Sequence, residues 1–162
     1  MSNRFFAILL IIIAVIGGVI FVSKNKSDTP SVTDTPPSNI TTGKGTTGVT
    51  LVEYGDFQCP VCASFFPIVQ QVKEKYGDQI TFQFRNFPLS EIHPNAVIAA
   101  RAAMAANNQG KFWEYHDLLY QNQTSWAESN DPVSILDGYA EQLGLDMQQF
   151  RSDRASNEIN NV

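Results

Sequence analysis

The chain has 162 residues, 43% of them hydrophobic, and a formal net charge of −5 at pH 7. This length accommodates one modest domain and excludes a large multidomain enzyme. The acidic balance argues against a nucleic-acid partner, because phosphate binding needs clustered Lys and Arg side chains and the sequence contains no basic stripe. The 2 cysteines are too few for a disulfide-rich secreted scaffold, and alone they cannot complete a tetrahedral zinc site.

An uncharged apolar run occupies residues 5–22, with the sequence FFAILLIIIAVIGGVIFV. As a helix rising about 1.5 Å per residue it spans roughly 27 Å, which is close to the thickness of a bilayer's hydrocarbon core. We therefore predict a transmembrane anchor over residues 1–22, which crosses the cell membrane once and leaves the C-terminal body extracytoplasmic. A cleaved secretory signal is the alternative, although such signals have shorter apolar regions and end in a small-residue site.

The next segment, residues 23–48, consists almost entirely of Ser, Thr, Pro, Gly, Asn, Asp and Lys, with Val32 and Ile40 as its apolar side chains. Such a segment buries too little apolar surface to offset the entropy lost on ordering. We predict a disordered tether over residues 23–48 and a folded domain over residues 49–162.

The first part of the folded domain is predicted to be a β-α-β unit. Residues 49–54 are rich in β-branched side chains and indicate a strand. Residues 60–76 begin with a proline and carry apolar side chains at helical spacing, and residues 80–87 alternate apolar and polar side chains. A strand, a helix and a strand over about forty residues form a right-handed crossover with parallel strands.

Helical patterns account for the chain that follows. They cover residues 96–107, 111–122, 132–143 and 147–153. The first is rich in alanine, the second is rich in aromatic side chains, and the third begins with an Asp-Pro pair that is typical of a helix start. The sequence therefore predicts the α/β class, with helices after the β-α-β unit.

Both cysteines, Cys59 and Cys62, lie where the first strand is followed by the helix, with Pro60 and Val61 between them. This spacing lets the first helical turn bring two sulfur atoms within disulfide distance, and the helix N-terminus favours a thiolate. A stabilised thiolate both attacks and leaves readily, as disulfide exchange requires. We therefore predict Cys59, just outside the helix, as the nucleophile and Cys62, one turn inside it, as the buried resolving thiol.

Three other interpretations of the cysteine pair remain open. Half of a zinc site needs a further Cys or His pair, but His93 and His116 are 23 residues apart. A purely structural disulfide closes so small a loop that it contributes little stability. Chance placement is the third interpretation, but C-x-x-C at a strand-to-helix junction is the context typical of a redox-active pair.

Four segments together resemble the DsbA-like thioredoxin-fold oxidoreductases. They are EYGDFQCPVC at residues 53–62, FPLSEIHP at residues 87–94 before the Ala-rich helix, GKFWEYHD at residues 110–117, and GLDMQQF at residues 144–150. These segments extend over nearly the whole predicted domain, so the resemblance is far more specific than C-x-x-C alone.

The resemblance implies a fold and an activity. The fold is a thioredoxin-like β-α-β unit with a helical domain inserted from about residue 95, and the activity is disulfide exchange with exported proteins. No cofactor is implied beyond the redox-active Cys59–Cys62 disulfide. A membrane redox partner is implied, because the cysteine pair must be reset after each exchange.

The resemblance also implies roles for residues around the cysteines. Glu53 matches the position of a buried acid beneath the active site, where a carboxylate relays protons to Cys62, although strand alternation alone leaves a solvent-facing Glu53 open. Pro60 and Val61 are supporting residues. Val61 replaces the His of the family's strongest oxidants, so we expect a less oxidising couple. By contrast, we expect His93 to have a packing role.

One departure from the family concerns the end of the sequence. Family members continue with a cis-proline loop, an antiparallel strand pair and a final helix, and the 162 residues contain no such pattern. We therefore expect the C-terminal ββα half to be absent and the chain to be an N-terminal piece of a longer protein. Oxidase and reductase or isomerase directions use the same residues. Alternatives of another class are a redox-silent binding module and a truncated fragment without function.

Overall fold

The computed structural model describes residues 40–156, which belong to one compact unit. The predicted transmembrane anchor at residues 1–22 and the first part of the predicted tether lie outside the described residues. Within residues 40–156, no helix combines the length and the apolar character needed to cross a bilayer.

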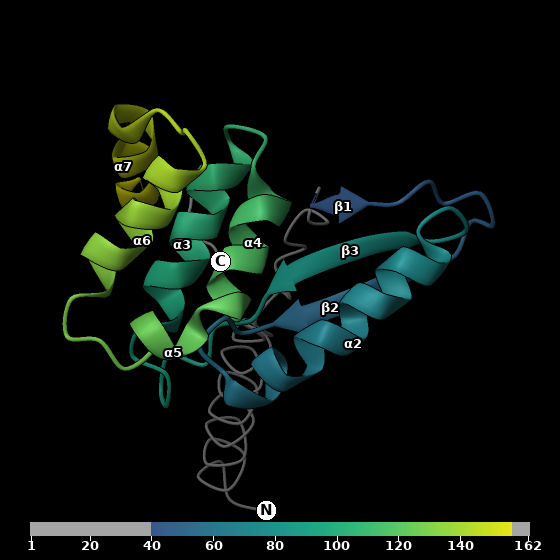
Figure 1. Ribbon diagram of the computed structural model, residues 1–162, viewed down its shortest axis with the longest axis horizontal. Coiled ribbons are helices and arrows are strands. Elements are labelled where there is room, and N and C mark those ends of the chain that lie inside the picture. Colours follow the sequence, from purple (N-terminus) through teal and green to yellow (C-terminus); the bar gives the residue numbers. More distant parts are fainter. Residues whose placement is uncertain (1–39, 157–162) are drawn as a thin grey trace, which may run out of the picture. The chain divides into compact units, whose positions relative to one another are not determined.

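The sheet has three strands, β1 (Thr41–Thr42), β2 (Thr50–Gly55) and β3 (Thr81–Asn86), in the order β1-β3-β2. β2 and β3 are parallel, with Glu53 opposite Phe84, which confirms the predicted parallel pair. The crossover between them is helix α2 (Pro60–Tyr76), whose bounds match the predicted helix. Figure 1 shows α2 lying alongside β2 and β3.

The prediction of a disordered tether is wrong for the residues nearest the domain. Ile40 is buried, and Thr41 and Thr42 form β1, which pairs with β3 in the antiparallel direction. Backbone hydrogen bonds from Lys44 to the Gly77 carbonyl (2.8 Å) and from Thr47 to the Gln79 carbonyl (2.9 Å) fix the following turn. An edge strand is held mainly by backbone groups, so a polar composition does not prevent it from forming.

Five helices follow β3 within the described residues: α3 (Ala96–Asn107), α4 (Phe112–Gln121), α5 (Gln123–Trp126), α6 (Pro132–Gln142) and α7 (Met147–Ala155). They confirm the predicted helical region after about residue 95, although the predicted helix at 111–122 ends at Gln121 and α5 begins separately. Small side chains let α3 contact α4, α6 and α7 closely. Its buried alanines are Ala96, Ala99, Ala100, Ala102, Ala103, Ala105 and Ala106.

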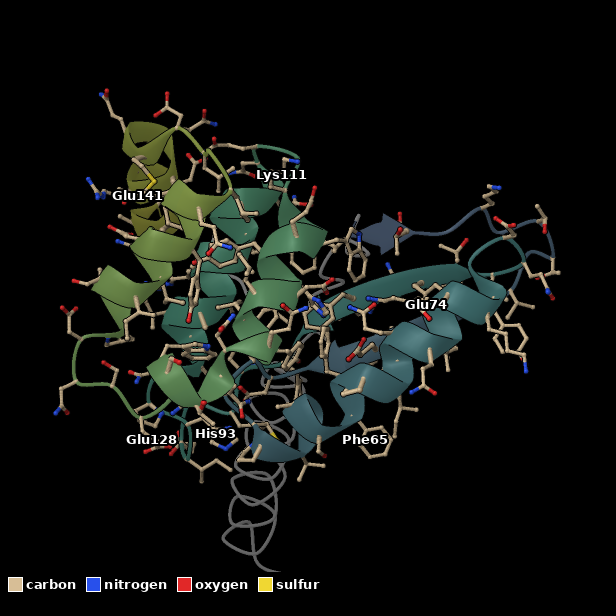
Figure 2. All side chains as sticks on the ribbon, viewed as in Figure 1. Phe65, Glu74, His93, Lys111, Glu128 and Glu141 are labelled. Atoms are coloured by element: carbon tan, nitrogen blue, oxygen red, sulfur yellow. The ribbon has the colours of Figure 1, made fainter. Side chains whose placement is uncertain are left out.

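Apolar side chains are buried unevenly between the two parts of the domain. The hydrophobic core runs from Phe57 and Phe84 into the helices, where Trp126 and Phe150 are fully buried. On β2 and α2, by contrast, large apolar side chains are exposed, and Figure 2 shows the Phe65 ring projecting outward from α2. These exposed side chains are Leu51, Val52, Tyr54, Val61, Phe65 and Ile68. β2 is an edge strand, because its partner in the described sheet is β3 on one side.

Candidate active site

The cysteine pair lies at the N-terminus of α2, as the sequence predicts. Cys59 is the N-cap residue with extended backbone, and Pro60 occupies the first helical turn, where its missing N–H costs no hydrogen bond. Cys62 is one turn inside the helix and packs against the hydrophobic core. Both side chains are free thiols of intermediate exposure, so Cys62 is less buried than the sequence predicted.

The environment of Cys62 keeps its thiol protonated. Burial is the main cause that raises the pKa of Cys62, and a hydrogen bond from the Asp56 backbone opposes this shift. The hydrogen bond with Cys59 and the charges of Cys59 and Asp56 raise the pKa further. A resolving thiol has to lose its proton before it attacks, so Cys62 needs a base or a hydrogen-bond donor for that step.

Asp56 organises the loop that leads from β2 to Cys59. Its side chain is buried, and its two carboxylate oxygens accept hydrogen bonds from the backbone N–H of Gln58 (2.8 Å) and of Leu89 (2.9 Å). His93 Nδ1 lies 2.6 Å from Asp56 Oδ2, and the Asp56 carbonyl accepts a hydrogen bond from the Cys59 N–H (3.1 Å). Asp56 therefore connects the cysteine loop to the segment between β3 and α3.

His93 has a more specific place than the packing role predicted for it. The ion pair with Asp56 is largely buried, with side-chain exposures of 15% for His93 and 3% for Asp56. Figure 2 shows His93 to the left of the N-terminal end of α2. The sequence signal was the resemblance in the FPLSEIHP segment, but no local pattern connects a histidine there to an aspartate 37 residues earlier.

Two amide side chains attach the same loop to the helical region. Gln58 Nε2 donates to the Ala127 carbonyl (2.6 Å), and Gln58 Oε1 accepts from the Asn95 N–H (2.6 Å). From α5, Gln123 Nε2 donates to the carbonyls of Phe57 (2.8 Å) and Cys59 (3.0 Å). Sequence reasoning missed both amides, since their partners are backbone carbonyls and a backbone N–H far away in the chain.

The other predicted site residues occupy distinct positions. Glu53 is partly buried on β2, where burial raises the pKa of its carboxyl and the charge of Lys73 opposes the shift. Burial also lowers the pKa of Lys73, and the charges of Asp117 and Glu53 oppose that shift. Val61 is 64% exposed beside the cysteines and presents an apolar surface there. The role of Glu53 as a proton relay stays a prediction.

The geometry defines a class of protein. A Cys-x-x-Cys pair at the N-terminus of a helix that crosses between parallel strands is the arrangement of thioredoxin-fold redox proteins. The family model described as thioredoxin matches residues 35–162, which is most of the chain. The chain belongs to the thioredoxin family.

Relatives and solved structures make this assignment more specific. A thioredoxin-like oxidoreductase from Silicibacter pomeroyi has a TM-score of 0.60 and 27% identity, and the match covers 75% of this chain and 65% of that one. The alpha-DsbA1 structure from Wolbachia pipientis has a TM-score of 0.61 and 20% identity, covering 75% of this chain and 61% of that one. The resemblance to DsbA-like proteins is therefore confirmed at the level of the fold.

A protein from Salinispora arenicola named Na⁺/H⁺ antiporter NhaA 1 is 45% identical over 107 residues. The match covers 66% of this chain and 16% of the antiporter, so the chain corresponds to a small part of that protein.

Proposed function

We propose that the protein is an extracytoplasmic thiol–disulfide oxidoreductase that exchanges disulfides with exported proteins through Cys59 and Cys62. The observation that carries the proposal is the cysteine pair at the N-terminus of α2, on a loop held by hydrogen bonds to Asp56, Gln58 and Gln123. A loop fixed in this way presents the Cys59 sulfur at the end of α2, and Cys62 lies one turn inside the helix.

In the oxidising direction, a client thiolate attacks Cys59 Sγ of the Cys59–Cys62 disulfide. The bond between the two cysteine sulfurs breaks, Cys62 leaves as a thiolate that takes up a proton, and Cys59 is joined to the client. A second client thiolate then attacks the client sulfur of this mixed disulfide and releases Cys59. The client has lost two electrons, the cysteine pair has gained them, and a membrane redox partner resets the disulfide. Reduction and isomerisation use the same atoms in reverse.

The reaction is tested by replacing each cysteine in the full, reduced chain and supplying a client protein that contains a disulfide. We expect Cys62→Ser to accumulate a mixed disulfide with the client, because the resolving thiol is absent, and Cys59→Ser to form none. Wild-type protein should turn over without accumulation. Equal and slow reaction of both thiols in the wild type contradicts the proposal and favours a redox-silent binding module, for which the exposed apolar side chains of β2 and α2 provide a surface.

The proposed location is the outer side of the cell membrane. Its support is the apolar run at residues 5–22, which is long enough to span a bilayer. A membrane-impermeant thiol reagent applied to intact cells should label Cys59 as completely as it does after lysis. Labelling only after lysis would place the domain on the other side.

A further inference from the structure

Tyr120 on α4 carries a buried hydroxyl that the reaction outlined above does not use. The residue is 5% exposed, and its Oη has no hydrogen-bond partner within the described residues. Buried hydroxyl groups are normally paired, because an unpaired one loses its hydrogen bonds to water without replacement. An unpaired group in the core therefore suggests a partner that becomes available only in another state of the molecule.

The Tyr120 ring packs against aromatic side chains that flank the cysteine pair in the sequence. Its centroid lies 5.1 Å from that of Phe57 and 5.4 Å from that of Phe66. Phe57 precedes Cys59 by two residues, and Phe66 follows Cys62 by one helical turn on the same face of α2. Aromatic side chains on both sides of the cysteine pair thus hold the Tyr120 ring.

Space for the hydroxyl depends on a glycine at the end of β2. A Cβ atom at Gly55 would lie 2.8 Å from Tyr120 Oη and 2.4 Å from the Phe84 ring. The hydroxyl therefore occupies the point where β2 ends and the Asp56 loop begins. The Asp56 backbone also lowers the pKa of Cys62, so the same turn acts on the resolving cysteine.

The titratable groups around the hydroxyl include both cysteines. Cys62 has the strongest electrostatic interaction with Tyr120, followed by Glu53 on β2, Asp56 on the loop and Cys59 at the helix start. Burial, with these negative charges, raises the pKa of Tyr120 far above its ordinary value, so the hydroxyl keeps its proton and remains a donor.

One further titratable side chain packs against Tyr120. The His116 ring lies 5.0 Å from the Tyr120 ring, and burial lowers the pKa of His116. Its Nδ1 is 2.8 Å from Asp117 Oδ1. His116 is therefore neutral at neutral and alkaline pH, and its ionisation does not interfere with measurements there.

We propose that the Tyr120 hydroxyl donates a hydrogen bond to Cys62 Sγ as this sulfur becomes a thiolate, which rests on the exchange reaction proposed above. In the step that resolves a mixed disulfide, the Cys62 proton passes to a base, which is the role predicted for Glu53. The electron pair of the thiolate forms the Cys62–Cys59 bond, the bond from Cys59 to the outgoing sulfur breaks, and the outgoing thiolate takes that electron pair. Tyr120 gains and loses no proton.

The test uses the reduced full chain and an aromatic disulfide whose thiolate product is coloured. Attack by Cys59 releases one coloured thiolate, and attack by Cys62 on the resulting mixed disulfide releases a second. Rates of both phases are measured against pH for the wild type, Tyr120→Phe and Tyr115→Phe. In Tyr120→Phe we expect the second phase to slow by about tenfold, with its pH midpoint raised by about one unit, because a hydrogen bond to a charged group is lost.

Tyr115→Phe is the matched control. Tyr115 is also buried on α4, but its hydroxyl donates to the Leu136 carbonyl at 2.8 Å, within the helical region. This variant should unfold at lower denaturant concentration and keep the wild-type second phase, whereas Tyr120→Phe should retain its stability. The inference is overturned if the second phase and its pH midpoint are unchanged in Tyr120→Phe, or if Tyr115→Phe slows that phase equally. Failure of the wild type to release the second thiolate overturns the proposed function instead.

Discussion

Large apolar side chains are exposed in the β-α-β unit of this domain and buried in its helical region. In the helical region, Trp126, Leu136 and Phe150 are fully buried around the alanines of α3. In the β-α-β unit, Tyr54 on β2 and Phe65 on α2 are more than half exposed. The helical region therefore has a closed core, whereas the β-α-β unit leaves large apolar side chains of β2 and α2 exposed to solvent.

The cysteines lie on the boundary between these two regions. Cys62 packs against the common core, while Val61 next to it is exposed. The loop before them is tied to the helical region by Gln123 and Gln58. The helices therefore hold the site rigidly, and the exposed side chains of β2 and α2 supply an apolar surface beside it.

The largest expected effect on stability comes from removing a buried side chain in the helical region. Trp126→Ala removes a fully buried ring and its hydrogen bond to the Leu119 carbonyl (2.9 Å). We expect the free energy of unfolding to fall by about 3–5 kcal/mol, measured by denaturant titration. Phe65→Ala, on the exposed face, should change it by less than about 0.5 kcal/mol. Similar losses for both variants would show that the two regions do not differ in how much their apolar side chains contribute to stability.

The second prediction concerns the buried ion pair at the boundary. Asp56→Asn removes the charge that faces His93 and weakens the acceptors for Gln58 and Leu89. We expect a loss of about 3 kcal/mol, because buried hydrogen-bond donors lose a charged acceptor. Asp78→Asn, which breaks the solvent-exposed pair with Lys44, should produce no measurable change. If Asp56→Asn unfolds like the wild type, the loop does not depend on this pair.

A matched pair of glycines tests packing in the two regions. Gly55→Ala places a Cβ 2.4 Å from the Phe84 ring, so we expect a loss of about 1–3 kcal/mol from overpacking. Gly138→Ala adds a Cβ in open space on α6 and should stabilise the protein by about 0.5–1 kcal/mol through reduced chain entropy. Thermal or denaturant unfolding of both variants provides the measurement, and a gain for Gly55→Ala would contradict the tight contact.

The smallest expected effect is a pH dependence from Glu53. Burial raises the pKa of Glu53 in the folded protein, so the unfolded chain releases this proton first as the pH rises. The wild type should therefore lose stability relative to Glu53→Gln as the pH increases from below the ordinary value of 4.5 through the folded pKa. Above that pH interval, the difference in the free energy of unfolding between the wild type and Glu53→Gln should be constant. Unfolding titrations across the acid range would contradict the buried position of Glu53 if the difference did not change.

Much of the fold was predictable because its signals are local. The proline at the start of α2 and the alternation in β3 identified these elements, and the cysteine spacing identified the site. β1 was not predictable in the same way, because Thr41 and Thr42 are held by backbone hydrogen bonds to a distant strand. We assigned Ile40 to the tether from composition alone, but its side chain is buried in the core.

The support around the cysteines was predictable only in part. The position of Glu53 followed from the family resemblance, but the partnership of Asp56 with His93 depends on two loops meeting in space. The contacts of Gln123 could not be predicted, since a polar side chain at the start of a short helix ordinarily faces solvent. The role of Tyr120 was not predictable either, because its position in the aromatic pattern of α4 is that of an ordinary core residue.

The hydrogen bonds from Gln123 to the carbonyls of Phe57 and Cys59 have a consequence for the speed of exchange. Ordering a flexible loop at each encounter would add an entropic term to the activation barrier. Here the backbone around Cys59 is ordered during folding, before any client arrives. The barrier that a client meets should then be governed by bond making and breaking between sulfur atoms, and a Gln123→Ala variant should slow exchange chiefly through its activation entropy.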